Sequence, residues 1–361
     1  MFYAGLDYHT KRSFVSVLNE QGDEVCANSL ESQTELAGFL ANLPDDCQVL
    51  FEAGYGWPRL VRILEGAGVE LKMCQPNRNS RIVMDRRKSD FRDARNLAVY
   101  LKSNTYREAW MPDESVRDER QLARRRVSLQ REMVGIKLHI YSLLAYAGVP
   151  KEPGDIFAVK RRDYLESVGL PRLTRRTLDA LLSVYDEIRD RVKELGVVIR
   201  ELNKADPRAR LLKTIPGIGD IAAGLLLAEI GEISRFRTPK SLSCYTGLTP
   251  GQHQSGDVLR MTGLTKEGCA NMRWILIQAA WVAVRRDPAL GQKFEELCRE
   301  KADVVAICAI ARQLAEIIWH ILTKEVPYQA QKPKGKSQPV VACGKPSADG
   351  SPLMAAASPK M

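Results

Sequence analysis

The sequence lacks the signatures of several protein classes. No apolar run reaches the roughly 18 residues that a membrane-spanning helix requires, and Met1 to Asp7 contain no basic segment followed by an apolar one. The eight cysteines stand singly, without a Cys-x-x-Cys pair or a histidine at zinc spacing. We therefore expect a cytoplasmic protein with reduced cysteines and no membrane, disulfide framework or structural zinc site.

Acidic residues are fewer than basic ones. The chain has 54 Lys and Arg against 44 Asp and Glu, which gives a formal net charge of +10. Because Lys and Arg gain affinity for phosphates by releasing condensed counterions, this balance favours a polyanionic partner. A hydrophobic content of 45% and a charged content of 27% indicate a globular protein. A length of 361 residues suggests two or three domains.

The first hundred residues alternate between two periodicities. Apolar and β-rich runs predict strands, and runs with helical periodicity lie between them. The expected strands are 2–8, 13–18, 24–28, 48–52 and 69–74, and the expected helices are 33–42, 57–66 and a last one from Asp90. This order predicts an α/β domain with a mixed sheet and helices on its faces.

Four acids occupy notable places in this order. Asp90 and Asp93 share a face of the last helix because they are three residues apart, although acids at a helix start also serve as caps. Asp7 lies on the first strand and Glu52 closes the fourth, where each could instead face water. Together they match ribonuclease H-like nucleases and recombinases, in which two divalent ions bridge carboxylates and the scissile phosphate.

The middle of the chain has heptad spacing. Apolar residues recur at seven-residue intervals in two sets, Leu122, Leu129, Ile136, Leu143 and Leu178, Tyr185, Val192, Ile199. They predict an antiparallel or dimer-forming coiled-coil arm, with ordinary amphipathic core helices as the alternative. The first helix also carries six arginines, Arg124 and Arg125 among them. These form either a face toward nucleic acid or a solvated surface.

The last part contains two candidate functional loops. The segment 216–219, Pro-Gly-Ile-Gly, predicts a helix-hairpin-helix whose amides approach a phosphate, or else a simple interhelical turn. Ser255 stands in a polar loop before a glycine, with His253 two residues away. Such a serine is usually only a loop residue, and the histidine could be a base or structural. Cations that could hold a phosphate follow it, namely Arg260, Lys266 and Arg273.

These motifs resemble one family when they are taken in order. They are Gly5-Leu6-Asp7, Glu52-Ala53-Gly54-Tyr55-Gly56, Lys88-Ser89-Asp90-Phe91-Arg92-Asp93-Ala94, Ile215-Pro216-Gly217-Ile218-Gly219, Gly247-Leu248-Thr249-Pro250, and Ser255-Gly256 followed by Lys266-Glu267-Gly268 and Arg273. Over nearly all of residues 2–328 the chain resembles the DEDD-type transposases of the insertion-sequence one-ten family, which are related to pilin-gene invertases. It departs from many members at Thr10 and Ser89, where they carry lysine and threonine.

The resemblance implies an architecture and a chemistry. The architecture is an RNase H-like (RuvC-like) domain at 1–112, an all-α coiled-coil arm at 113–205, a mainly α transposase domain with the helix-hairpin-helix at 206–328, and a disordered tail at 329–361. Asp7, Glu52, Asp90 and Asp93 would bind Mg²⁺, with Mn²⁺ as a substitute, and Ser255 would attack DNA to form a phosphoserine intermediate.

The resemblance also implies partners. The nucleic-acid partners are the DNA ends of the element, the target DNA and a non-coding bridge RNA. Further copies of the chain would join it in a dimer or a synaptic tetramer. The two halves of an active site would then come from different protomers. Two rival functions stay open. One is a metal-dependent structure-specific nuclease in which water attacks, and the other is a non-catalytic nucleic-acid-binding protein whose acids are structural caps.

Overall fold

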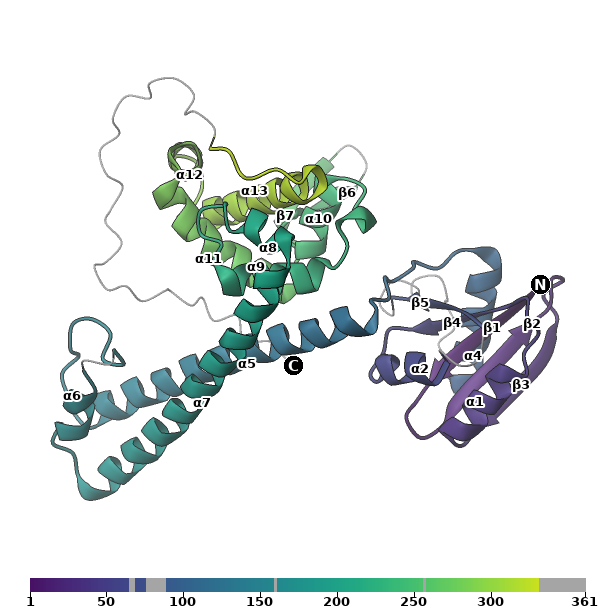
Figure 1. Ribbon diagram of the computed structural model, residues 1–361, viewed down its shortest axis with the longest axis horizontal. Helices are drawn as coiled ribbons and strands as arrows, with labels where there is room; N and C mark the ends of the chain where they lie inside the picture. Colours follow the sequence, from purple (N-terminus) through teal and green to yellow (C-terminus); the bar gives the residue numbers. More distant parts are fainter. Residues whose placement is uncertain (65–68, 76–88, 159–160, 256–257, 331–361) are drawn as a thin grey trace. The chain divides into compact units, whose positions relative to one another are not determined.

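A computed structural model describes residues 1–64, 69–75, 89–158, 161–255 and 258–330 (Figure 1). The chain divides into two compact units, Met1–Pro112 and Asp113–Met361. The tail that was predicted to be disordered lies outside the described residues from residue 331 onward, as do Lys88 and Gly256 of the family motifs. Each unit is described by itself below.

The first unit is built on a five-stranded sheet with the order β3-β2-β1-β4-β5. Its strands are β1 (Phe2–Tyr8), β2 (Ser13–Leu18), β3 (Glu24–Leu30), β4 (Cys47–Glu52) and β5 (Glu70–Cys74). The pairs β1–β2 and β2–β3 are antiparallel, and the pairs β1–β4 and β4–β5 are parallel. This confirms the predicted mixed sheet, with β1 at its centre.

Among the described residues of this unit, the helices that cover the sheet are α1 (Gln33–Ala41), α2 (Trp57–Leu64) and α4 (Asp90–Ser103). Leu6 of β1 is buried in one cluster with residues of α1 and α2. Residues of α4 form another cluster with Leu50 of β4. Because side chains alternate along a strand, Gly5 faces α4, where a Cβ would overlap the backbone of Ala94 and Ala98. The glycine therefore allows α4 to lie directly on β1.

The second unit begins with two long helices, α5 (Glu114–Tyr146) and α7 (Arg172–Ala205), with the short α6 (Arg162–Ser167) between them in the chain. They lie side by side in Figure 1 and form a helical hairpin. The predicted series on α7 is buried at Leu178, Tyr185, Val192 and Ile199. On α5, Ala123 and Val127 are buried rather than Leu122 and Leu129, because α9 (Asp220–Ile230) packs against that side.

The remaining elements form a mainly helical domain around a large apolar core. In chain order they are α8 (Pro207–Leu212), α9, the 3-10 turn η2 (Ile233–Arg235), α10 (Pro239–Thr246), β6 (Pro250–Ser255), β7 (Val258–Leu264), α11 (Ala270–Arg286), α12 (Pro288–Cys298) and α13 (Asp303–Lys324). By length and composition, α13 is the one helix of the described residues that could cross a membrane. Here, Ile310, Leu314 and Ile318 of α13 are fully buried in the core.

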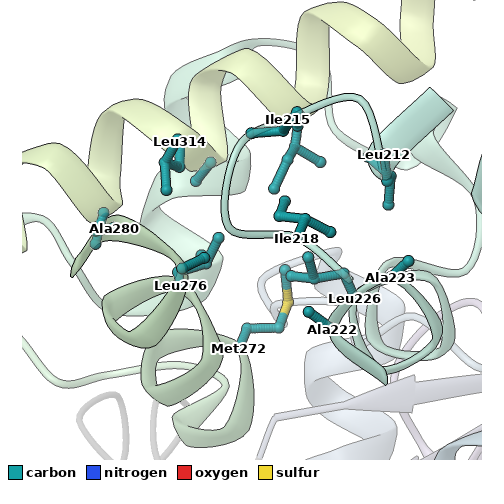
Figure 2. Close-up of a cluster of buried hydrophobic side chains, with 14 of the residues drawn as sticks. Leu212, Ile215, Ile218, Ala222, Ala223, Leu226, Met272, Leu276, Ala280 and Leu314 are labelled. Carbon is teal, nitrogen blue, oxygen red and sulfur yellow. The ribbon is translucent and has the colours of Figure 1, made fainter. Parts of the chain in front are cut away.

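The predicted hairpin connects α8 to α9. Its Ile215 and Ile218 point into the cluster formed by residues of α9, α11 and α13 (Figure 2). Gly217 has φ +93°, and a Cβ there would overlap the carbonyl oxygen of Ala279 in α11. Because both the dihedral and the close approach require glycine, the hairpin is a fixed part of the core.

Candidate metal centre and nucleophile

The four predicted acids come from three elements of the first unit. Asp7 is the second-last residue of β1, and Glu52 is the last residue of β4. The parallel register pairs Leu6 with Phe51, so Asp7 and Glu52 follow side by side on the face that α4 covers. The structure thus places two carboxylates at the carboxyl ends of neighbouring strands.

The other two acids start α4. The side chain of Ser89 caps the helix by accepting a hydrogen bond from the backbone N–H of Arg92, and Asp90 and Asp93 lie in the first turn. Ser89 therefore supplies the cap that the acids could have supplied. Carboxylates in the first turn are favourable for the helix dipole, but the cap leaves both acids available to a ligand.

Electrostatic effects connect several of these acids. Burial raises the pKa of Asp7 most, nearby His9 lowers it, and the charges of Asp90 and Asp93 raise it further, with a net upward shift. The pKa of Tyr100 is also raised, first by burial and then by the charges of Glu52 and Asp93. Asp93 therefore acts on Asp7 and also on Tyr100, the side chain on which Glu52 acts.

His9 joins this cluster, although the sequence analysis did not single it out. Its Nε2 lies 3.2 Å from Oδ2 of Asp7. One potential ligand atom from each of Asp7, His9 and Asp90 lies within 4.8 Å of the other two. The signal was present in the sequence, because residues two apart on an extended chain point to the same side.

The cluster fits a divalent cation. Carboxylate oxygens and an imidazole nitrogen are common ligands of divalent ions. The pKa of Asp7 is raised because burial, and after it the charges of Asp90 and Asp93, disfavour the charged form of a side chain that is 23% exposed. A bound cation would reverse this penalty. The arrangement can hold a metal ion and present it to an anionic substrate.

Ser255 is the last residue of β6, in the second unit. It pairs with Val258 at the start of β7, and His253 pairs with Arg260. The predicted polar loop is therefore wrong in detail: the segment is a two-stranded hairpin, because backbone pairing orders a run whose side chains are mostly polar. Gly256 and Asp257, the two residues between the strands, lie outside the described residues.

Two of the predicted phosphate-binding cations follow the hairpin. Lys266 is exposed and has φ +54°. Nη1 of Arg273 donates hydrogen bonds to the carbonyl oxygens of Thr246 and Lys266, at 3.1 and 3.3 Å. Arg273 thus fixes the turn that carries Lys266.

Arg124 of the basic helix α5 has a partner inside the protein. Its Nε and Nη2 each donate to a different carboxylate oxygen of Glu229 at 2.7 Å, and the Glu229 side chain is fully buried. Arg120 donates to the carbonyl oxygens of Ala228 and Glu229 at 2.7 and 2.8 Å. These contacts fasten α5 to the end of α9, whereas Arg125 is exposed. A nucleic-acid contact by Arg124 or Arg125 stays a prediction.

Burial alone would raise the pKa of Glu229. The hydrogen bonds and charge of Arg124, with the charge of Arg120, outweigh burial and lower it. The pKa of Arg124 is raised by the same hydrogen bonds. Glu229 was not among the predicted functional residues, and its geometry is that of a structural ion pair.

Comparison with known proteins gives consistent matches in both units. A family model described as "Transposase", of the DEDD type, matches residues 4–147, and a model described as "Transposase IS116/IS110/IS902 family" matches residues 209–295. The transposase for insertion sequence element IS1328 of Yersinia enterocolitica is 28% identical over 320 residues, which cover 87% of this chain and 95% of that protein.

Two further proteins are similar to this chain. The transposase for insertion sequence element IS1111A of Coxiella burnetii is 27% identical over 80% of this chain and 81% of its own length. The pilin gene-inverting protein of Moraxella bovis is 34% identical over 173 residues, which cover 43% of this chain and 53% of that protein. The similarity therefore includes both transposases and a DNA-inverting protein.

Proposed function

The chain belongs to the IS116/IS110/IS902 family of transposases, enzymes that cleave and transfer DNA, and we propose that it works through a phosphoserine intermediate assisted by divalent ions. The observation that carries the proposal is the approach of Asp7 and Asp90, together with His9, within 4.8 Å of one another. Glu52 ends the strand beside Asp7, and Asp93 lies in the same helical turn as Asp90, which supports their inclusion in the site. The order β3-β2-β1-β4-β5 supports an RNase H-like class for this domain, residues 1–112.

The four acids would hold Mg²⁺, with Mn²⁺ as a substitute. When bound, such ions lower the cost of negative charge on the attacking and leaving oxygens of a phosphoryl transfer. The role of the protein itself is to keep the carboxylates together. The close packing of α4 on Gly5 and the Ser89 cap accomplish this, since both fix the first turn of α4 beside the strand ends.

Ser255 would be the nucleophile. Its hydroxyl oxygen bonds to the scissile phosphorus, the phosphorus bond to the leaving sugar oxygen breaks, and the serine proton is released as the leaving oxygen gains one. A hydroxyl from another strand then attacks the phosphoserine and frees the serine, which rejoins DNA without an external energy source. The position of Ser255 at the end of β6, next to a glycine, supports this role.

The positive charge suits the nucleic-acid partners of such a reaction. Arg260, Lys266 and Arg273 would steady the phosphate, and the exposed Arg125 would contact DNA or a guiding bridge RNA. The helical hairpin, residues 113–205, would join copies of the chain into dimers and tetramers. Exposed apolar residues on it support this, namely Leu138, Leu173 and Val184. Residues 206–328 would form the transposase domain that supplies the nucleophile, and the four acids would supply the metal site. The reaction would take place inside the cell.

Trapping the intermediate tests this proposal. A nicked or suicide substrate should give a covalent protein–DNA adduct that survives denaturant, and Ser255→Ala should abolish both adduct and strand transfer while leaving nucleic-acid binding intact. Thr262→Ala removes another hydroxyl from the same hairpin and should keep full activity. Cleavage by Ser255→Ala, or hydrolysis without any adduct, would instead favour the metal-only nuclease.

A further inference from the structure

We propose that His9 is a nitrogen ligand of the metal centre and biases this centre toward Mn²⁺ over Mg²⁺. The inference rests on the proposed function, since it assumes that the acids hold a divalent ion. It goes further by naming a ligand outside the four acids and a preference among metals.

The distances suit direct ligation. Ligands on adjacent corners of an octahedron lie about 3 Å apart when each is about 2.1 Å from the ion. Nε2 of His9 and Oδ2 of Asp7 are 3.2 Å apart. Asp90 completes a group whose ligand atoms all lie within 4.8 Å of one another, a limit that includes the separation of about 4.2 Å for opposite corners. Little movement would therefore bring all three residues onto one ion.

The backbone around His9 is held in place. Asp7 and Tyr8 pair with Phe14 and Ser13 of β2. Oγ of Ser13 also donates a hydrogen bond to the carbonyl oxygen of His9 at 3.3 Å. Because His9 follows Asp7 by two residues at the end of this strand, both side chains project to the same side. The imidazole is thus presented by the sheet, with its side chain 57% exposed.

The chemistry of the ligands gives the preference. Mg²⁺ is a hard cation that favours oxygen ligands and keeps several waters, whereas transition-metal ions accept imidazole readily. Carboxylates alone discriminate weakly between Mg²⁺ and Mn²⁺. One imidazole therefore shifts the balance toward Mn²⁺. In the competing arrangement, His9 only hydrogen-bonds to Asp7 and orients it.

Pulsed EPR of Mn²⁺ bound to the full-length protein distinguishes the two arrangements, since it detects coupling to a directly bound ¹⁴N. We expect this coupling in the unchanged protein and its loss in His9→Gln. The glutamine amide can still donate a hydrogen bond to Asp7, but it lacks the imidazole nitrogen. The affinity for Mn²⁺ should fall about tenfold in this variant, while the affinity for Mg²⁺ changes little. His139→Gln alters an exposed histidine of α5 and should retain both coupling and affinity.

The outcomes separate this inference from the function on which it rests. If Mn²⁺ binds and Asp7→Asn weakens the binding, but no ¹⁴N coupling appears, His9 is not a ligand and only the present inference fails. If the unchanged protein binds no Mn²⁺, or Asp7→Asn leaves the affinity unchanged, the four-acid centre itself is wrong and both proposals fall.

Discussion

Two carboxylates in this protein are shielded from water in opposite ways. Glu229 of the second unit is fully buried, and both of its oxygens accept hydrogen bonds from Arg124. Asp7 of the first unit is partly buried beside Asp90 and Asp93. The surroundings lower the pKa of Glu229 and raise that of Asp7.

This difference separates a structural ion pair from a binding site. The charge of Glu229 is satisfied within the protein, so it needs no ligand and joins α5 to α9. The charge of Asp7 is disfavoured first by burial and then by Asp90 and Asp93, and His9 offsets this only in part. A cation would relieve that penalty. Burial is thus compensated by a cationic partner at Glu229 and left uncompensated at Asp7.

Among the changes that test this comparison, removing the charge of Glu229 should have the largest effect on stability. Glu229→Gln removes the buried carboxylate that accepts both hydrogen bonds of Arg124, and we expect the free energy of unfolding to fall by about 3 kcal/mol. Denaturant titration of the full chain measures it. Glu232→Gln, at a nearby exposed glutamate, should change stability by less than about 0.5 kcal/mol. Equal effects in the two variants would show that the buried pair contributes little.

A smaller effect is expected from the packing that holds the acid cluster together. In Gly5→Ala, the added methyl group meets the backbone of Ala94 and Ala98, so α4 must move away from β1 at a cost of about 2 kcal/mol. Strand cleavage should fall with it, because the first turn of α4 carries Asp90 and Asp93. The measurements are unfolding free energy and cleavage rate.

Gly38→Ala is the matched control for Gly5→Ala. Gly38 lies in the exposed middle of α1, where a Cβ would meet nothing within 4 Å. Because alanine favours helix more than glycine does, this change should stabilise the first unit by up to about 1 kcal/mol. If Gly5→Ala proved equally harmless, α4 would not depend on the close approach, and the acids would need another explanation for their placement.

The sequence predicted which elements carry the acids Asp7, Glu52 and Asp90, but it did not predict the ion pair of Glu229 and Arg124. Strand alternation and helical spacing place Asp7, Glu52 and Asp90 without tertiary information, because each lies at the end of a regular element. Glu229 and Arg124 are 105 residues apart, and no local pattern connects them. Arg124 was accordingly assigned to a basic face, since counting charges does not show which of them find partners on folding.

Other misses have local causes. His9 was not predicted as a ligand because it lies just beyond the end of β1, where strand alternation alone does not fix the direction of a side chain. In the first half of α5, at Leu122 and Leu129, the heptad spacing placed the buried face beside its true position, because a two-helix seam does not anticipate the third helix, α9. In the second half, Ile136 and Leu143 of the predicted series do pack against the cluster shared with α7. Periodicity predicts a face of a helix, but the neighbours in the fold decide which residues of that face are buried.

The smallest expected effect has the opposite sign and is a dependence on pH. The pKa of Asp7 is raised above its ordinary value of 3.8, so the folded state binds this proton more tightly and loses stability as the pH rises from that value through the folded pKa. In buffer free of divalent metal, Asp7→Asn should therefore be more stable than the unchanged protein above this window, by less than about 1 kcal/mol.

For Glu229, whose pKa is lowered from 4.5, the stabilisation exists above the ordinary value and disappears as the pH falls. The difference between Glu229→Gln and the unchanged protein should therefore shrink on acidification. Denaturant titrations of both variants between pH 4 and 7 provide the test, at about 0.5 unit intervals. If Asp7→Asn were less stable at neutral pH, Asp7 would be satisfied like Glu229, and the contrast between the two acids would be wrong.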